Sequence, residues 1–265
     1  MTSPEKITHN GFTIYTYGQP ADPHAVIEQM SRGEIIRDKG RGGIRLLSVD
    51  GKKMACRQYL HGGLFRAITG DRFCSEKRAL DEAGILCCLA ENGFPVVRPC
   101  CVVAERAGIA KRLYLITEFV QDASDLLDVW RMTSGIKRLR IIKSLAGLFR
   151  TLELLGIYHP DLHINNILLT GQGKLVFLDF DRARKKTVTT DDMEKMFRRL
   201  DRYMEKQKRR GGITLDMRDK IFFLRIYQKL SGCDILSRME KQFKTRAFLN
   251  RIGWIVESFL YGGNR

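Results

Sequence analysis

Two short acidic segments carry the residues of this chain that are best suited to chemistry. The first reads His-Pro-Asp-Leu-His-Ile-Asn-Asn over residues 159–166, and the second reads Val-Phe-Leu-Asp-Phe-Asp over residues 176–181. Between them lie a short apolar run, a Gly-Gln-Gly turn and a second apolar run, which together predict a β-hairpin. Because a hairpin returns the chain to its starting point, Asp161, Asn166 and Asp179 are predicted to converge at one end of it.

These three side chains supply the groups that phosphoryl transfer from a nucleotide requires. A carboxylate orients or deprotonates the attacking hydroxyl, and an amide oxygen and a second carboxylate hold Mg²⁺. The order of groups matches the kinase catalytic-loop pattern H-x-D-L-x-x-x-N, followed one hairpin later by D-F-x. We therefore predict a centre that uses ATP and Mg²⁺, with Asp161 as the catalytic carboxylate and Asn166 and Asp179 as metal ligands.

Three further polar residues flank this predicted centre. His159 is predicted to brace the loop by hydrogen bonding rather than to transfer protons. His163 is predicted to point toward the transferred phosphoryl group, where it either donates a hydrogen bond or is simply exposed. Asp181 either supports the metal or only ends the strand, and the sequence leaves both interpretations open.

A glycine-rich segment and a basic strand residue are the candidates for binding the nucleotide phosphates. Gly40, Gly42 and Gly43 open a predicted hairpin, where their small size lets backbone N–H groups approach phosphate oxygens closely. On the next strand Arg57 follows Met-Ala-Cys, at the position where the kinase pattern V-A-I-K places a phosphate-binding lysine. An arginine keeps the positive charge and binds phosphate through two parallel hydrogen bonds.

The surroundings of this arginine leave two assignments open. Either the arginine binds phosphate, which its position in the strand pattern favours, or Lys52 or Lys53 reaches inward instead. Glu82 shares the buried face of a predicted helix and is the expected ion-pair partner of the arginine, while Asp81 points about 100° around that helix. Glu118, where the two predicted halves of the chain join, is expected to present backbone groups to adenine.

The order of predicted elements indicates an α+β chain of two lobes. Residues 1–120 read as a small β-sheet lobe with one helix that binds the nucleotide, and residues 121–265 as a larger helical lobe. In the long helix predicted over Thr133–Leu155, Ile136 and Leu139 are assigned to the buried apolar stripe. The predicted strands are Gly11–Tyr17, Ile44–Val49, Met54–Leu60, Val96–Ala104 and Leu113–Val120, and the other predicted helices are Ser75–Asn92, Thr190–Gln207, Asp216–Leu230 and Asp234–Leu260.

The bulk properties narrow the class of protein and its partners. The 265 residues carry a net charge of +16, with 44% hydrophobic and 9% aromatic residues, which suits a globular protein. Residues 1–130 hold 17 Lys and Arg against 16 Asp and Glu, whereas residues 131–265 hold 29 against 14. Such a basic half attracts polyanions such as nucleic acid, anionic lipid head groups or a phosphorylated substrate. The seven cysteines show no C-x-x-C spacing, so we expect reduced thiols. The sequence shows no pattern typical of a secretion signal or of a membrane span.

The motifs resemble the Kdo/WaaP lipopolysaccharide kinases, a branch of the protein-kinase-like superfamily. The arginine on the third strand, the Gly-Gly-Leu that follows it and the Asp-Phe-Asp triplet are similar to this family rather than to eukaryotic protein kinases. One departure is His163, which stands where asparagine is expected and forms an Asp-Leu-His triplet that also occurs in aminoglycoside- and choline-kinase-like phosphotransferases. The resemblance rests on residues 40–42, 56–64, 93–99, 158–169 and 178–181.

The resemblance implies a bilobal protein-kinase-like fold and an ATP-dependent kinase acting on a sugar hydroxyl of the lipopolysaccharide inner core. The implied acceptor is 3-deoxy-D-manno-octulosonic acid (Kdo) on a lipid A precursor, and the implied location is the cytoplasmic face of a bacterial inner membrane or the cytoplasm. The implied partners are this glycolipid and an anionic membrane surface, with no nucleic acid. Two alternatives stay open, a soluble small-molecule phosphotransferase and a non-catalytic nucleic-acid-binding module, and the intact Asp/Asn/Asp set argues against the second.

Overall fold

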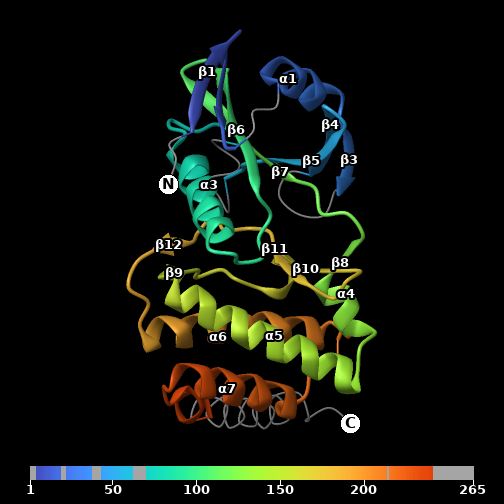
Figure 1. Cartoon of the computed structure of the whole chain (residues 1–265), viewed down its shortest axis with the longest axis vertical. Coiled ribbons are helices and arrows are strands. Elements are labelled where there is room, and N and C mark those ends of the chain that lie inside the picture. Colours follow the sequence, from blue (N-terminus) through green and yellow to red (C-terminus); the bar gives the residue numbers. More distant parts are fainter. Residues whose placement is uncertain (1–3, 19–21, 38–42, 62–69, 214, 241–265) are drawn as a thin grey trace, which may run out of the picture. The chain divides into compact units, whose positions relative to one another are not determined.

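The computed structural model describes residues 4–18, 22–37, 43–61, 70–213 and 215–240 (Figure 1). The described residues form two compact units. One, called here the sheet unit, comprises residues up to 129 together with residues 159–185, and the other, called the helical unit, comprises residues 130–158 and those from 186 onward. The predicted α+β, kinase-like class is confirmed by an antiparallel N-terminal sheet followed by a run of helices. The predicted division between residues 120 and 121 stays a prediction.

The sheet unit is built on seven antiparallel strands (Figure 1). Because side chains alternate between the faces of a strand, Met54 and Cys56 point to one face, where they pack with Val26 of α1 (Pro23–Arg32). Arg57 and Tyr59 therefore point to the other face. In spatial order the strands are β1 (Glu5–His9), β2 (Phe12–Thr16), β6 (Pro99–Ala107), β7 (Ala110–Glu118), β5 (Lys52–Gln58), β4 (Ile44–Val49) and β3 (Glu34–Arg37).

Helix α3 (Lys77–Glu91) packs against β6 and β7 and carries one acidic residue into the interior. Its buried residues recur at helical spacing, which is the pattern expected of a helix with one face on a sheet. Glu82 lies within this face and is 1% exposed. The helix ends at Glu91, and Gly93 follows in the left-handed conformation with φ of 71°. The predicted helix Ser75–Asn92 is thus confirmed with its buried carboxylate.

A second, three-stranded sheet contains the predicted catalytic hairpin. Strands β10 (Ile167–Thr170) and β11 (Leu175–Phe177) pair antiparallel, and β8 (Ala123–Asp125) flanks β10. The turn includes Gly173, whose φ of 76° favours glycine. A short 3₁₀ helix, η1 (Ile164–Asn166), leads into β10. The hairpin prediction is therefore confirmed.

The helical unit is organised around an aromatic cluster. Phe149 of α5 (Gly135–Leu154) lies 5.4 Å from Phe197 and 5.6 Å from Phe223, measured between ring centroids. Such edge-to-face and tilted contacts add to the burial of the rings. The unit also contains β9 (Ile157–Tyr158), α6 (Thr190–Arg209) and α7 (Met217–Ser231), whereas β12 (Arg184–Lys185) and most of α4 (Leu126–Arg131) belong to the sheet unit.

Helix α5 differs from its prediction in which residues it buries. Ile136 and Leu139 are 71% and 43% exposed, whereas Arg138 is only 8% exposed. Arg138 is accommodated because its guanidinium lies 4.8 Å from the Trp130 ring centroid and 3.4 Å from a carboxylate oxygen of Asp219. The buried stripe thus includes this arginine in place of the two aliphatic residues. Assigning Ile136 and Leu139 to the core was wrong.

Several elements were not predicted, and part of one prediction cannot be compared. The sequence did not indicate α1, although Asp22 caps it by accepting a hydrogen bond of 3.0 Å from the His24 amide and Pro23 occupies its first position. Strands β1, β3 and β8 and helix α4 were also missed. Of the helix predicted over Asp234–Leu260, residues 235–240 are helical and the rest lies outside the described residues.

Candidate active site

The structure brings the three predicted oxygen-bearing residues to one end of the hairpin. Ile167 pairs with Phe177, and beyond this pair the Leu178 amide donates a hydrogen bond of 2.9 Å to the Asn166 carbonyl. Asp179 follows directly after Leu178, so its backbone lies beside that of Asn166. The hairpin register alone therefore positions the two proposed metal ligands next to each other.

His159 fixes the loop that carries Asp161. Its ring is 2% exposed, its Nε2 lies 2.8 Å from the Asp179 carbonyl, and its Nδ1 accepts a hydrogen bond of 3.3 Å from the Asp161 amide. Because Nδ1 accepts, the proton sits on Nε2, which donates to the carbonyl, and the ring is neutral. Burial lowers the pKa of His159 below its usual range, although the nearby Asp179 and Asp161 act in the opposite direction. The predicted bracing role is confirmed by these contacts.

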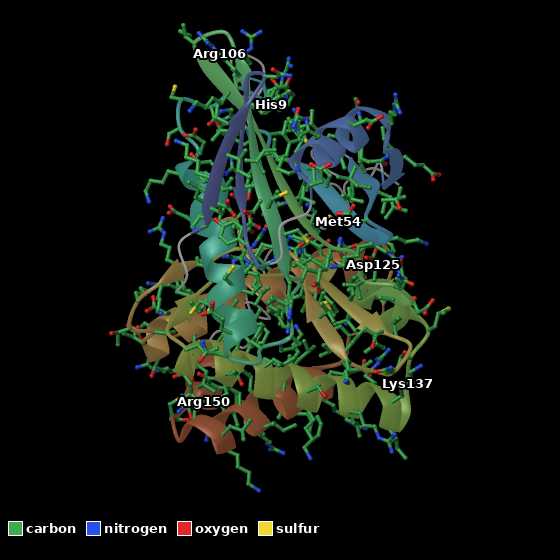
Figure 2. The ribbon with its side chains drawn as sticks, turned by 45° about the horizontal axis from the view of Figure 1, so that its top comes forward. His9, Met54, Arg106, Asp125, Lys137 and Arg150 are labelled. Atoms are coloured by element: carbon green, nitrogen blue, oxygen red, sulfur yellow. The ribbon has the colours of Figure 1, made fainter. Side chains whose placement is uncertain are left out.

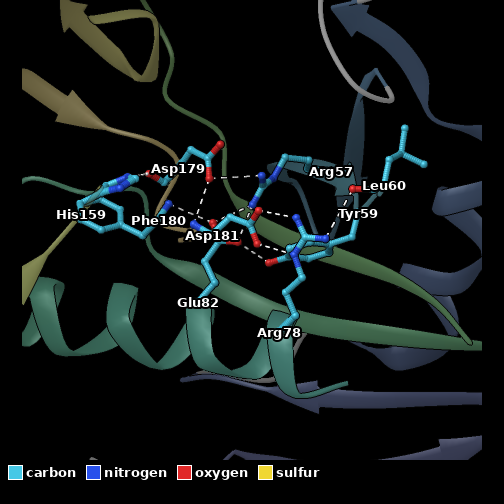
Figure 3. A network of polar contacts seen from close by, with 9 residues as sticks. All are labelled: Arg57, Tyr59, Leu60, Arg78, Glu82, His159, Asp179, Phe180 and Asp181. Atoms are coloured by element: carbon cyan, nitrogen blue, oxygen red, sulfur yellow. Dashed lines mark hydrogen bonds and ion pairs between the residues drawn. The ribbon is translucent and has the colours of Figure 1, made fainter. Parts of the chain in front are cut away.

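Arg57 and Glu82 form the predicted ion pair (Figure 3). Nη2 of Arg57 lies 2.6 and 2.7 Å from the two oxygens of the Glu82 carboxylate. The same carboxylate accepts a hydrogen bond from the Tyr59 hydroxyl and one of 3.1 Å from the Phe180 amide. Burial raises the pKa of Glu82 to about 7, and the Arg57 guanidinium opposes that rise. The hydrogen bonds from Arg57, Tyr59 and the Phe180 amide favour the charged carboxylate and so act against the effect of burial.

Asp179 connects this ion pair to the hairpin. Its Oδ1 lies 3.4 Å from Nη1 of Arg57 and accepts a hydrogen bond of 3.1 Å from the Asp181 amide. Burial alone would raise the pKa of Asp179, but Arg57 and the Asp181 amide outweigh it, so the pKa lies below its usual range. Its Oδ2 has no hydrogen-bond or ion-pair partner among the described residues, and in Figure 3 that oxygen points away from the dashed contacts.

An ionised carboxylate with a free oxygen, whose backbone lies beside that of an asparagine, fits a hard cation such as Mg²⁺. Mg²⁺ usually takes one or two protein carboxylates, with phosphates and water as its other ligands. Asn166 and Asp179 are therefore suited to a metal that arrives with a nucleotide rather than to a closed structural site.

Asp181 lies in a second ion pair beside the first. Arg78 donates to both of its carboxylate oxygens, and the bond from Nε measures 2.6 Å. The Arg78 guanidinium also lies 5.3 Å from the ring centroid of Tyr59 and donates to the Leu60 carbonyl. Asp181 therefore forms an ion pair with Arg78 of α3, in addition to following the strand that ends the hairpin.

The catalytic candidate Asp161 stays accessible. Its side chain is 36% exposed, and one carboxylate oxygen lies 4.0 Å from Nη1 of Arg182. His163, two residues later, is half-buried, and its carbonyl accepts a hydrogen bond of 3.0 Å from the Asn166 amide. A carboxylate on a braced loop and open to solvent can receive an external hydroxyl group.

The other residues predicted to bind the nucleotide, Lys52, Lys53 and Glu118, are exposed at the ends of two strands of the seven-stranded sheet. Lys52 and Lys53 are exposed at the beginning of β5, and Arg57 is the basic residue of that strand that contacts Glu82 and Asp179. Glu118 is exposed at the end of β7, where its amide already donates a hydrogen bond of 2.9 Å to the Arg98 carbonyl.

Of the three candidate glycines, one falls within the part of the chain that the structure describes. Gly43 directly precedes β4. Gly40 and Gly42 lie outside the described residues, so the proposal that this segment contacts phosphates stays a prediction.

Sequence reasoning missed two members of the network, Tyr59 and Arg78. Both carried a signal that periodicity could have revealed. Tyr59 lies two residues after Arg57, which places it on the same face of the strand. Arg78 precedes Glu82 by four residues and so shares its side of α3.

Comparisons with known proteins agree with this geometry. The lipopolysaccharide kinase (Kdo/WaaP) family profile matches residues 29–227, which is more than half of the chain. Proteins named 3-deoxy-D-manno-octulosonic acid kinase are similar to the chain. The one from Xanthomonas oryzae pv. oryzae is 28% identical over 190 residues, covering 70% of this chain and 75% of that protein. The one from Stenotrophomonas maltophilia is 25% identical over 201 residues, covering 74% and 80%.

A third relative, from Vibrio parahaemolyticus, is 29% identical over 153 residues, or 55% of this chain. The match spans 62% of that relative's length, which is less than two thirds. The family assignment does not depend on this relative, because the profile match covers both the Arg57 strand and the catalytic hairpin. The chain therefore belongs to the lipopolysaccharide kinase (Kdo/WaaP) family.

Proposed function

We propose that this chain transfers the γ-phosphoryl group of ATP to a sugar hydroxyl of the lipopolysaccharide inner core, with Kdo on lipid A as the acceptor. The observation that carries the proposal is the convergence of Asp161, Asn166 and Asp179 on one braced hairpin that is tied to Arg57. The family and the names of the similar proteins support the acceptor class.

In this proposal Arg57 neutralises the nucleotide phosphates. One of its nitrogens, Nη2, is held by the Glu82 carboxylate, and Nη1 faces Asp179, so the planar guanidinium has a fixed orientation. The side chain is still 28% exposed and can meet a ligand. Glu82 also receives the Phe180 amide, so a single carboxylate positions both the cation and the segment that carries Asp179.

Asn166 and Asp179 would hold Mg²⁺, which bridges the nucleotide phosphates and offsets the charge that develops on them. Asp161 orients the acceptor hydroxyl and takes its proton, which its accessible carboxylate allows. His163 lies on the same short loop, and we assign it to donating a hydrogen bond to the transferred phosphoryl group. His159 holds this loop against the Asp179 carbonyl and does not exchange protons with the substrate.

The test is to incubate the protein with Mg²⁺, labelled ATP and a panel of acceptors. The panel contains Kdo-lipid A, heptose-bearing core oligosaccharides, an aminoglycoside and choline. We expect label in Kdo-lipid A alone or in strong excess. Labelling of none of the four, by protein that binds ATP, would contradict the proposed reaction.

A second candidate function is a small-molecule phosphotransferase of the aminoglycoside or choline type. The Asp-Leu-His triplet at residues 161–163 is the feature that favours it. This candidate predicts label in the aminoglycoside or in choline and no dependence on detergent or lipid. The same acceptor panel therefore separates the two reactions.

We further propose that the protein associates peripherally with the anionic cytoplasmic face of the inner membrane. Over the described residues, no helix has the length and apolar character needed to cross a bilayer. The candidate surface, called here the α5 patch, combines exposed apolar and basic side chains at the beginning of α5, where Figure 2 labels Lys137. Its members are Met132 at 88% exposure, Ile136, Leu139, Lys137, Arg140 and Lys143.

Ile136, Leu139, Arg140 and Lys143 follow one another at helical spacing, so they share one side of α5. Basic residues attract anionic lipid head groups by about 1 kcal/mol each, and apolar side chains add to the affinity when they enter the interface. The strongly basic second half of the sequence supports the same partner.

A further inference from the structure

Beside the proposed centre the sheet unit contains an open pocket of about 870 Å³. It is lined by five cationic side chains, Arg72, Lys77, Arg78, Arg182 and Arg184, which define what we call the basic pocket. All five lie in the sheet unit. They come from three segments: the chain that leads into α3, the beginning of α3 itself, and the residues that follow the Asp-Phe-Asp triplet.

The carboxylates in the lining do not neutralise this charge. Asp81 pairs with Lys77 at 2.7 Å, and Asp181 pairs with Arg78. The third carboxylate, Glu82, is taken up by Arg57, which is not part of the lining. Two of the five cations are therefore balanced inside the pocket, and three arginines remain.

The three remaining arginines differ in their surroundings. Arg72 and Arg184 have no carboxylate partner within the described parts of the chain. Arg182 lies 4.0 Å from Asp161, a contact at the outer limit of an ion pair, and its side chain is 60% exposed. An excess of guanidinium groups around an open cavity is suited to binding a carboxylate or phosphate group.

The pocket borders the reacting centre on the side of Asp161. Pro160, the residue before Asp161, lines it, and Arg182 connects the lining to the Asp161 carboxylate. Arg57, which we assign to the nucleotide, lies outside the lining and contacts Glu82 and Asp179 instead. An anion held by Arg182 and its neighbours in the pocket therefore lies close to the carboxylate that orients the acceptor.

We propose that the basic pocket binds an anionic group of the acceptor, a carboxylate or a phosphate, and so positions the acceptor hydroxyl against Asp161. The proposal rests on the proposed phosphotransferase reaction and adds to it the requirement that the acceptor is an anion. The carboxylate of a sugar acid and a phosphate of the lipid that carries it offer the same chemistry to an arginine.

The first experiment needs no acceptor turnover. Inorganic phosphate is titrated into the full-length protein, and binding is followed by calorimetry for wild type, Arg72→Gln, Arg184→Gln and Arg106→Gln. Arg106 is the matched control, because it is an exposed arginine of the same unit near the tip of the β6–β7 hairpin and is not part of the pocket (Figure 2). We expect each pocket variant to weaken phosphate binding about tenfold, the loss of one charge-assisted hydrogen bond, and the control to bind like wild type.

The second experiment measures KM for Kdo-lipid A and for ATP in the same four proteins. The pocket variants are expected to raise the acceptor KM roughly tenfold and to leave the ATP KM unchanged, which a general loss of structure would not do. Two altered acceptors identify the source of the anion, one with the sugar carboxylate methyl-esterified and one with the lipid phosphates removed. The acceptor that lacks the bound group is used equally well by wild type and the pocket variants.

The two experiments separate failure of the pocket from failure of the proposed reaction. If wild type transfers phosphate to no acceptor but the pocket variants still weaken phosphate binding, the reaction is wrong and the anion site stands. Equal phosphate affinity in wild type and both pocket variants overturns the anion site. An unchanged acceptor KM in both variants of an active enzyme overturns its role in positioning the acceptor.

Discussion

At the scale of single residues, the site depends on one buried carboxylate that serves several partners. Glu82 is 1% exposed and receives hydrogen bonds from Arg57, Tyr59 and the backbone of Phe180. If this carboxylate were lost, water could not take over its hydrogen bonds, because the surrounding residues exclude solvent. The orientation of Arg57 and the position of the Asp179 segment therefore depend on the same side chain.

Substitution of Glu82 by Gln should separate these roles from general helix stability. Because the amide keeps the shape but loses the charge opposite Arg57, we expect the free energy of unfolding to fall by about 1–3 kcal/mol and ATP affinity to weaken. Urea unfolding and nucleotide titration measure the two effects. Glu91→Gln, an exposed position on the same helix, is the matched control and should change neither. If Glu82→Gln bound ATP as tightly as wild type, the Arg57–Glu82 ion pair would have no role in nucleotide binding.

Asp161→Asn tests the catalytic carboxylate. The amide retains the size of the side chain but cannot take a proton, so we expect kcat to fall at least ~100-fold. Nucleotide affinity should persist, because Arg57 and Asp179 are untouched. The comparison is made by steady-state kinetics and by ATP titration of the same preparation. Turnover equal to that of wild type would exclude Asp161 from the chemistry.

At the scale of elements, the catalytic hairpin could be predicted because its signals are local. Two short apolar runs, the Gly-Gln-Gly turn between them and the flanking acidic segments indicate both strands, and their register brings Asn166 and Asp179 together. The Arg57–Glu82 pair was also predicted, since strand and helix periodicity place both side chains on inner faces. Helical periodicity places Arg78 on the same side of α3 as Glu82, but its pairing with Asp181 depends on how distant segments pack, which no local pattern indicates.

The buried face of α5 is a second case in which local sequence patterns do not determine tertiary packing. Sequence patterns normally assign an arginine on a helix to the solvent-exposed face. Arg138 is nevertheless buried, because its guanidinium contacts the Trp130 ring and the Asp219 carboxylate. Helical periodicity gives a stripe of neighbouring positions, but the packing of α7 against α5 decides where that stripe ends. Ile136 and Leu139 lie just beyond it.

The bracing of the hairpin by His159 predicts a pH dependence of stability. In the unfolded chain this histidine binds a proton near its usual pKa of 6.5, whereas burial lowers its pKa in the folded protein. Below about pH 6.5 the unfolded state therefore holds more protons, so the free energy of unfolding falls as the pH is lowered, by at most about 1.4 kcal/mol per pH unit from this group. Urea unfolding between pH 7 and pH 5 measures the slope.

His159→Gln removes the titrating ring, so its unfolding free energy should change less steeply over this range than that of wild type. The comparison of the two slopes cancels the contributions of the other histidines. Equal slopes would mean that His159 is protonated in the folded protein, which contradicts its acceptance of the Asp161 amide at Nδ1.

At the scale of the whole molecule, charge is distributed unevenly along the sequence. Residues 131–265 carry nearly all of the excess of +16, and the α5 patch lies in that half. Composition predicts attraction to polyanions but not the surface responsible, because that depends on which side chains folding leaves exposed. The exposure of Ile136 and Leu139 beside Arg140 and Lys143 provides the missing information.

Binding to anionic vesicles tests this surface. We expect the protein to sediment with vesicles that contain anionic phospholipid, and less so as salt is added, because the attraction is screened. The double variant Ile136→Ser/Leu139→Ser should reduce partitioning about tenfold, whereas Leu154→Ser, at a position 68% exposed at the other end of α5, should not. Equal partitioning of all three proteins would place the membrane contact elsewhere.

The most direct measurement is the mass of Kdo-lipid A after incubation with the protein, ATP and Mg²⁺. The proposed reaction predicts a product heavier by one phosphate, with fragmentation placing that phosphate on the Kdo residue. The product should be absent when Asp179→Asn replaces wild type or when Mg²⁺ is withheld. An unchanged acceptor mass with wild-type protein that binds ATP, or a phosphate located on another part of the glycolipid, would contradict the proposal.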